Sequence, residues 1–553
     1  MTGSKKAGEK SADVRAGEAA RYAEMCEYGR KETSCPETQA RRSAAPDTLP
    51  VHCPGNAGTP MDVKARHIKK RRHAGAPHRR IAQQDGQEGR RMSKYLAMTQ
   101  TQLTRELERL RDCYEGFKQR GLALNMARGK PSPEQLELSM PLLSIFSPAS
   151  SSASSQTLSQ TVPQTFSPAS SLSPSPSDEL LAGHPNDLRN YGTLLGLPEA
   201  RALMADIMQV SAANVVVGGN SSLSLMYDLI SQSVTHGVLG SQPWLSLSEP
   251  ARFLCPAPGY DRHFAITEHF GIEMITVPMC ADGPDMDLVE RLANSDPRIK
   301  GIWCVPRFSN PTGVVYSEEV VNRMAALRPA AADFRVYWDN AYAVHSFEQT
   351  TVEGGVNTPA LASIQTIAEQ HGNPDIWYQF CSTSKITFAG AGIAAFATSE
   401  KNLKSIITRL GLQSIGPDKI NQKRHVLFLP DICAVREHMA RHAAILRPKF
   451  DAVLEELDRG LGPMGIGEWT RPQGGYFISF NGPVGTARRT VELAQGAGVV
   501  LTPAGATYPY GKDPQDANIR IAPTYPSLAE LRQASQIFVV CICIAAAETL
   551  LSH

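Results

Sequence analysis

The segment YQFCSTSKITFAGAGIAAFA, residues 378–397, predicts two short buried strands joined by a polar loop. Its apolar runs, residues 378–381 and 393–397, are bounded by Ser and Gly, as buried strands usually are. Between them lie Ser382-Thr383-Ser384-Lys385 and a glycine-rich stretch. A lysine directly after a buried strand is unusual, because desolvation lowers its pKa and makes the amine nucleophilic. A surface lysine at the start of a loop is the competing interpretation.

Five apolar runs upstream have similar lengths and similar Gly, Pro or Ser boundaries, and helical segments separate several of them. This alternation predicts an α/β fold with a largely parallel central sheet and helices on both faces. Ligands bind at the strand ends of such sheets, so the residues after each run are the candidates for chemistry. The runs are residues 215–217, 253–255, 274–277, 302–305 and 336–338.

Two of these runs are followed by polar motifs. After residues 302–305 comes Ser309-Asn310-Pro311-Thr312-Gly313, a tight turn whose asparagine can donate to an oxyanion. After residues 336–338 comes Asp339-Asn340-Ala341-Tyr342, and a carboxylate at a buried strand end is costly unless it meets a cation. A plain turn and a satisfied buried aspartate are the competing interpretations.

Composition divides the chain into segments. Residues 1–91 carry 19 Lys+Arg against 11 Asp+Glu and lack apolar periodicity, which predicts a basic disordered extension, with a nuclear-targeting or nucleic-acid-binding arm as the alternative. Ser and Pro fill 19 of the 34 positions 144–177, which predicts a flexible insertion over residues 144–178. We expect a large domain over residues 187–428 and a smaller α+β domain built from residues 92–143 and 429–553.

The whole chain has 553 residues, of which 42% are apolar and 20% charged, as in ordinary soluble proteins. Its eleven scattered cysteines include no CxxC pair, which predicts a reduced, cytoplasmic protein without a zinc site. Apolar residues at helical spacing predict an amphipathic helix over residues 101–122. The longest apolar run, residues 537–547, is too short to span a bilayer and predicts a buried C-terminal segment.

Taken in order, the motifs resemble those of the class I aminotransferases, which are fold-type I enzymes that use pyridoxal 5'-phosphate. The closest resemblance is to a divergent group of aspartate aminotransferases, and it covers residues 122–537 outside the Ser/Pro insertion. Each motif alone is weak, but the ordered set is highly specific. The motifs are Asn125-Met126-Ala127-Arg128-Gly129-Lys130-Pro131, Arg189-Asn190-Tyr191-Gly192, Gly218-Gly219-Asn220-Ser221-Ser222, Asn310-Pro311-Thr312-Gly313, Asp339-Asn340-Ala341-Tyr342, Ser384-Lys385 and Asn518-Ile519-Arg520.

The resemblance implies roles around the cofactor ring. Lys385 would hold the cofactor as a Schiff base and then act as the general acid and base. Asp339 would pair with the ring nitrogen and keep it protonated. Tyr342 and Asn310 would bond the phenolate oxygen, and Tyr260 would lie against the ring face, with a plain structural tyrosine as the alternative there.

The resemblance also implies a phosphate site at the start of a helix predicted over residues 223–230, where backbone amides and hydroxyls bind anions. Tyr191 would reach the phosphate of a partner subunit, which implies a homodimer with shared active sites. Many relatives place an arginine shortly after the lysine, but Ala391-Gly392-Ile393-Ala394-Ala395 holds no cation, so other groups must neutralise the phosphate. The expected phosphate ligands are Asn220, Ser221, Ser222, Ser382 and Ser384.

Arg520 would bind the substrate α-carboxylate through two parallel hydrogen bonds, and Arg128 and Gly129 would also contact the substrate. A dicarboxylate substrate needs a second cation, for which Arg128, Lys130, Lys419 and Arg424 are candidates. The resemblance favours L-aspartate and 2-oxoglutarate as substrates. An aromatic or broad-specificity aminotransferase, a pyridoxal-phosphate β-lyase and a cofactor-binding transcription regulator are the alternatives. No metal, membrane or nucleic acid is an expected partner.

Overall fold

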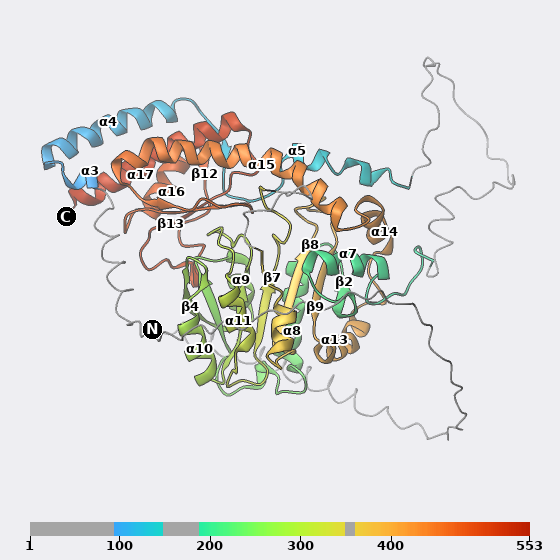
Figure 1. Cartoon of the computed structure of the whole chain (residues 1–553). Coiled ribbons are helices and arrows are strands. Elements are labelled where there is room, and N and C mark those ends of the chain that lie inside the picture. Colours follow the sequence, from blue (N-terminus) through green and yellow to red (C-terminus); the bar gives the residue numbers. More distant parts are fainter. Residues whose placement is uncertain (1–92, 147–186, 349–359, 553) are drawn as a thin grey trace, which may run out of the picture. The chain divides into compact units, whose positions relative to one another are not determined.

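The computed structural model describes residues 93–146, 187–348 and 360–552 (Figure 1). The predictions for the basic extension and for all but the first three residues of the Ser/Pro insertion lie outside these ranges. The described residues belong to one unit, Pro77–His553. The expected boundary between a large and a small domain stays a prediction.

An eight-stranded mixed sheet has the order β2-β9-β8-β7-β6-β3-β4-β5. The neighbouring pairs β4–β3, β3–β6, β6–β7 and β7–β8 are parallel. Strand β9 is antiparallel to β2 and β8, and β5 is antiparallel to β4. Each of the seven predicted apolar runs overlaps one strand, with Val305 and Ile393 lying one residue outside β6 and β9, and the α/β class is confirmed. The strands are β2 (Val215–Val217), β3 (Arg252–Ala257), β4 (Glu273–Cys280), β5 (Gly283–Pro284), β6 (Ile299–Cys304), β7 (Arg335–Asp339), β8 (Trp377–Ser382) and β9 (Ala394–Thr398).

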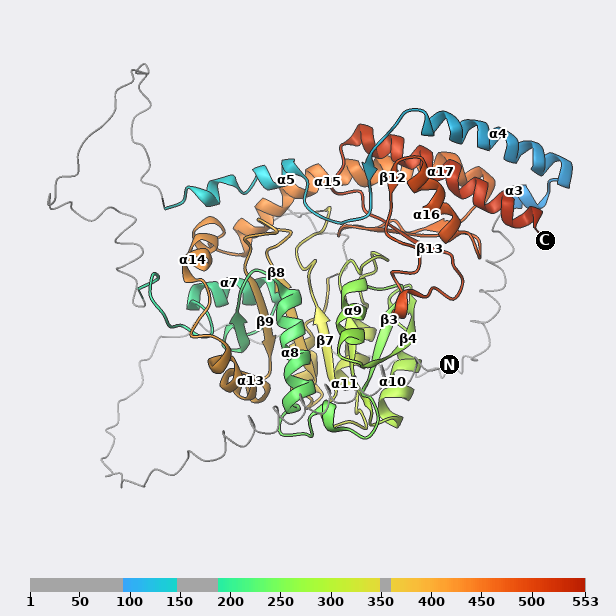
Figure 2. The same cartoon turned by 180° about the vertical axis from the view of Figure 1, so that it is seen from behind.

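Helices cover both faces of this sheet because alternate side chains of each buried strand point to opposite sides. In β7, Val336 and Trp338 belong to one hydrophobic core and Tyr337 to the other. The first core includes residues of α7 (Pro198–Met208), α10 (Met286–Ser295), α11 (Glu318–Ala326) and α12 (Ile364–Gln370). The second includes residues of α8 (Ser222–His236), α9 (Asp261–His269) and α13 (Glu400–Gln413), and α8 lies across that face in Figure 2.

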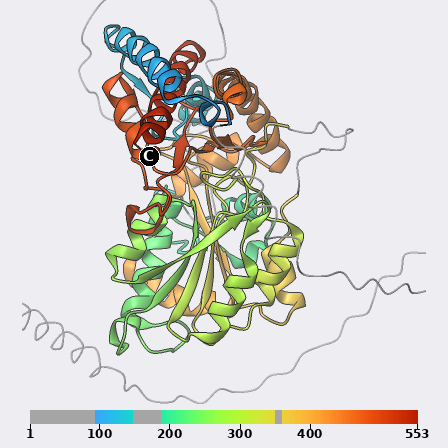
Figure 3. The ribbon, with the colours of Figure 1, turned by 90° about the vertical axis from the view of Figure 1, so that its left-hand side faces the viewer.

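A separate core joins the N-terminal and C-terminal segments, although they lie more than 300 residues apart. The predicted helix is α4 (Gln100–Lys118), which begins with a capping box at Thr99 and buries Leu103, Leu107 and Leu110. Figure 3 shows this helix beside the C-terminal helices, above the large sheet. The other elements of this region are α3 (Ser93–Leu96), β1 (Leu124–Asn125), α5 (Pro133–Glu137), α15 (Ile432–Leu461), β10 (Glu468–Trp469), β11 (Ile478–Asn481), α16 (Ala487–Gly496), β12 (Val499–Val500), β13 (Asn518–Ile521) and α17 (Leu528–Leu551); α14 (Lys419–Phe428) precedes them.

Two small sheets complete this core. Strands β10, β11 and β13 form an antiparallel sheet, and β1 pairs in parallel with β12. Strand β13 therefore belongs to a different sheet from β6, β7 and β8.

The C-terminal helix α17 is longer than its apolar run suggested. With 24 residues, it is long and apolar enough to cross a membrane by length and composition alone, so the expectation that this segment is too short was wrong. The expectation of burial is confirmed, since Ile537, Phe538 and Cys541 to Ala547 are buried and belong mostly to the core shared with α4 and α15. The apolar composition is explained by this packing.

Candidate functional site

A cavity of about 510 Å³ lies at the carboxyl ends of the parallel strands β6, β7 and β8 and also contacts β13. Parallel neighbours end at the same sheet edge, so residues from distant motifs meet there. Nine of the fourteen predicted site residues line this cavity, and no other described cavity collects so many. They are Arg128, Gly129, Ser222, Tyr260, Asn310, Asp339, Tyr342, Lys385 and Arg520.

The carboxylate of Asp339 is buried at the end of β7, and only one of its two oxygens has a hydrogen-bond partner among the described residues. Its Oδ2 lies 3.0 Å from His263 Nε2, and the His263 ring stacks on Trp303 with ring centroids 4.4 Å apart. Among the described residues, Asp339 Oδ1 has no hydrogen-bond partner. A buried carboxylate oxygen is stable there only if a ligand brings a donor or a positive charge.

Lys385 follows β8 on a turn whose carbonyls are held by buried histidines. His345 Nε2 lies 3.3 Å from Lys385 O, and His438 Nε2 lies 2.7 Å from Ile386 O. Burial lowers the pKa of the Lys385 amine, against the opposing effect of the Asp339 carboxylate. The amine is therefore shifted toward its neutral, nucleophilic form.

Aromatic side chains surround this amine. Lys385 Nζ lies 5.0 Å from the ring centroid of Tyr342 and 5.9 Å from that of Tyr476. Burial raises the pKa of Tyr342 well above its ordinary value and that of Tyr260 to about 12, so both hydroxyls keep their protons at neutral pH. Sequence reasoning missed Tyr476, which carries no motif and arrives from another part of the chain.

The five expected phosphate ligands lie close together, although only Ser222 lines the cavity. Ser384 Oγ donates to Asn220 O at 3.1 Å, and Ser382 Oγ donates to Ser384 Oγ at 3.1 Å. Ser221 Oγ accepts from Ser224 N and so caps α8. The helix N-terminus and these hydroxyls can bind an anion.

Residues 391–395, which lack the arginine expected from the family, need small side chains because of their place in the fold. It enters β9, which is hydrogen-bonded between β2 and β8. A Cβ on Gly392 would lie 2.8 Å from Thr383 Oγ1 and 3.2 Å from Ser384 N. A side chain there would therefore push against the turn that carries Lys385.

Arg520 lies on β13 and is only 7% exposed. Its Nη1 donates to Asp261 Oδ1 at 2.7 Å and to Asn310 Oδ1 at 3.2 Å, and its Nε donates to Thr502 Oγ1 at 3.3 Å. The guanidinium is thus fixed in the cavity wall, where it can meet a carboxylate.

The four candidates for a second cation separate into two groups. Arg128 and Lys130 line the cavity. Lys419 and Arg424 do not line it: Lys419 Nζ donates to the carbonyls of Asn190 and Gly192, and the Arg424 guanidinium lies 5.9 Å from the Phe146 ring centroid. Asp261 and Arg262 line the cavity and were missed, although they directly follow the predicted Tyr260.

Tyr191 is 80% exposed and does not line the cavity of its own chain. The loop that carries it packs on the residues before α14, where a Cβ on Gly416 would lie 2.2 Å from Gly192 O. The neighbouring Ile415 is 64% exposed. Two large side chains therefore project from this corner without cover from the described residues.

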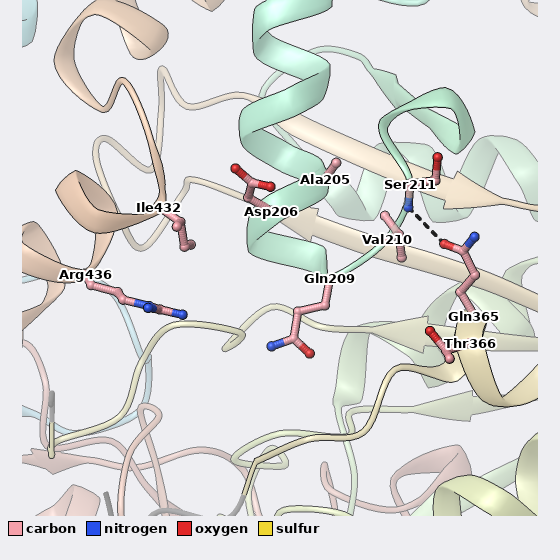
Figure 4. Close-up of a pocket in the computed structure, with 9 residues that line it drawn as sticks. All are labelled: Ala205, Asp206, Gln209, Val210, Ser211, Gln365, Thr366, Ile432 and Arg436. Atoms are coloured by element: carbon pink, nitrogen blue, oxygen red, sulfur yellow. Dashed lines mark hydrogen bonds between the residues drawn. The ribbon is translucent and has the colours of Figure 1, made fainter. Parts of the chain in front are cut away.

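A second cavity, of about 400 Å³, lies beside α7 and contains none of the predicted site residues (Figure 4). Asp206 and Arg436 lie on its walls, and the hydrogen bond drawn there joins Ser211 N to Gln365 Oε1 at 3.0 Å. This second cavity is open to solvent and brings together no set of reactive groups.

Comparison with known proteins gives one consistent picture. The aspartate amino-transferase family profile matches residues 98–161 and 167–553. The aspartate aminotransferase of Corynebacterium glutamicum is 44% identical over 436 residues, which cover 79% of this chain and 92% of that protein. A crystal structure of an aspartate transaminase from Corynebacterium glutamicum has a TM-score of 0.71 at 42% identity, covering 81% of this chain and 97% of that chain. The α-aminoadipate aminotransferase of Thermus thermophilus, solved with N-(5'-phosphopyridoxyl)-L-leucine, shares the fold at 20% identity and a TM-score of 0.56, covering 85% and 99%.

Proposed function

Because the chain belongs to the aspartate aminotransferase family of fold-type I aminotransferases, we propose that it transfers the amino group of L-aspartate to 2-oxoglutarate, giving oxaloacetate and L-glutamate. The observation that supports this substrate pair is the charge of one cavity. Arg520 lies on one wall, and Arg128, Lys130 and Arg262 also line it. A substrate with two carboxylates needs cations at two places, and this cavity offers them.

The residues of the cavity fit pyridoxal 5'-phosphate, which the family implies. The unpartnered Asp339 Oδ1 suits a protonated ring nitrogen, and the N-terminus of α8 suits a phosphate. The amine of Lys385 lines the same cavity and can attach to an aldehyde. When bound, the cofactor supplies a ring that stabilises negative charge at the α-carbon of the substrate.

The side chains of this protein then do three tasks. Lys385, whose pKa is lowered by burial, takes and returns the proton of the α-carbon. Asp339, held by His263, provides the negative charge that keeps a ring nitrogen protonated. Arg520 orients the α-carboxylate through its guanidinium, so that the α-hydrogen faces the amine of Lys385.

We also propose that the active protein is a homodimer with shared sites. Tyr191 and Ile415 are large and exposed at one corner of the chain. Exposed aromatic and aliphatic side chains that lie together are typical of an interface with another chain. A tyrosine presented this way can reach the phosphate site of a second copy.

The function is tested by mixing the purified protein, pyridoxal 5'-phosphate, L-aspartate and 2-oxoglutarate and measuring products. We expect oxaloacetate and L-glutamate in equal amounts, and no turnover by Lys385→Ala. Lys401→Ala is the matched control, since Lys401 is an exposed residue of α13. Strong preference for aromatic amino acids would contradict the substrate pair, and release of pyruvate and ammonia from L-cysteine, whose thiolate can leave the β-carbon, would indicate a β-lyase.

A further inference from the structure

Within the cavity, a carboxylate of the protein itself accepts a hydrogen bond from Arg520, the arginine proposed to bind the substrate. Asp261 Oδ1 accepts a hydrogen bond from Arg520 Nη1 at 2.7 Å, the shortest contact of this guanidinium. The Asp261 side chain is 32% exposed, whereas the Arg520 side chain is 8% exposed. Both residues line the same cavity. The aspartate can therefore leave toward solvent, while the arginine cannot.

Asp261 is not needed to hold Arg520 in place. Thr502 Oγ1 and Asn310 Oδ1 accept from the same guanidinium, and its carbon lies 4.9 Å from the ring centroid of Phe477. These neutral contacts come from three separate segments and fix the guanidinium plane. What they do not supply is a negative charge, and a buried arginine without one is costly.

Asp261 also has a second favourable environment. It is the first residue of α9, whose N-cap, Tyr260, provides no side-chain cap. A carboxylate in the first turn of a helix is stabilised by the unpaired backbone amides there. If Asp261 turns away from Arg520, its charge stays near these amides, so that releasing the arginine costs little.

We propose that Asp261 is a place-holder for the substrate α-carboxylate: it neutralises Arg520 in the empty site and gives up this position when a substrate carboxylate enters. This inference rests on the proposed function, because it takes Arg520 as the α-carboxylate ligand. Substrate binding then includes the loss of one charge-assisted hydrogen bond. Removing the charge of Asp261 should strengthen carboxylate binding, which is the opposite of what loss of a supporting residue would do.

The test measures the binding of succinate, a dicarboxylate that has no amino group to transfer, to the holoenzyme by calorimetry. We expect Asp261→Asn and Asp261→Ala to bind succinate roughly tenfold more tightly than the unaltered protein, in proportion to one charge-assisted hydrogen bond. The KM for L-aspartate should fall in the same direction. Glu268→Gln, which removes an exposed carboxylate from the same helix, should leave the succinate Kd unchanged.

The opposite results are distinguishable. If both Asp261 variants bind succinate equally or more weakly while the unaltered protein transaminates aspartate, the place-holder is wrong and Asp261 supports Arg520. If the unaltered protein neither binds succinate nor transaminates aspartate, the proposed function is wrong and the inference falls with it.

Discussion

His263 Nε2 lies 3.0 Å from Asp339 Oδ2, and both side chains are almost completely buried. The imidazole contacts one carboxylate oxygen, Oδ2, whereas Oδ1 has no hydrogen-bond partner among the described residues. Stacking on Trp303 fixes the imidazole plane. The charge of Asp339 is thus held in one orientation by one residue of α9 and one of β6.

Replacing this charge should impair the reaction more than it impairs folding. We expect Asp339→Asn to lower kcat about 10²–10³-fold, the usual effect of losing one preorganised electrostatic contact. Steady-state kinetics with saturating cofactor measures this change. Asp333→Asn is the control, because Asp333 is a buried carboxylate that pairs with Lys300 away from the cavity. It should lower stability but keep kcat, and a similar kcat for both variants would contradict the role of Asp339.

The lowered pKa of Lys385 predicts unusual reactivity in the cofactor-free protein. Desolvation favours the neutral amine, so acetic anhydride should modify Lys385 at a lower pH than it modifies exposed lysines. Asp339 opposes this effect, and Asp339→Asn should therefore move the labelling profile to still lower pH. Labelling across a pH series, read by peptide mass spectrometry, measures both shifts. A profile unchanged by Asp339→Asn would show that the two groups do not interact.

Buried histidines should make the protein sensitive to acid. Burial lowers the pKa of His442 to about 3, below its ordinary value of 6.5. Between these values the unfolded chain binds a proton at this position and the folded chain does not, so stability falls as the pH decreases from 6.5 toward 3. One such group contributes at most about 1.4 kcal/mol per pH unit.

The contribution of His442 is isolated by His442→Gln, compared with the unaltered protein by urea denaturation at pH 7.5 and pH 5. The variant should be less stable at pH 7.5, because Gln135 Nε2 donates to His442 Nδ1 at 2.9 Å and this bond is disturbed. Its further loss of stability at pH 5 should be smaller than that of the unaltered protein. Equal losses would contradict a buried neutral imidazole.

The sequence predicted the sheet well because its inner strands are buried on both faces. Such strands are continuous apolar runs, and the polar motif after each one marks the edge where ligands bind. All seven runs became strands, and Asp339, Lys385 and Asn310 meet in one cavity for this reason.

What the sequence did not predict depends on contacts between distant segments. Asp261 and Arg520 are 259 residues apart, and nothing in the sequence around either residue indicates that the two are in contact. Lys419 and Arg424 were candidates by charge, but no residue of α14 lines the cavity, and spacing alone does not reveal which helices do. The length of α17 was underestimated because only its unbroken apolar run was counted, whereas the helix begins nine residues earlier at Leu528.

Shared active sites predict that two inactive variants can restore each other. Lys385→Ala lacks the reactive amine, and Tyr191→Ala lacks the tyrosine proposed to reach a partner's phosphate site. When equal amounts are unfolded, mixed and refolded, half of the dimers are mixed, and each mixed dimer has one intact site. The product assay should then show about a quarter of the activity of the unaltered protein.

The matched control is a mixture of Lys385→Ala with Arg520→Ala. Both residues line one cavity of a single chain, so every site in the mixed dimer lacks one of them. No activity should return in this control, because exchange of subunits cannot bring the two intact residues together. No recovery in the mixture with Tyr191→Ala would show that Tyr191 acts within its own chain. Equal recovery in both mixtures would show that Arg520, too, comes from the partner, against the geometry of the cavity.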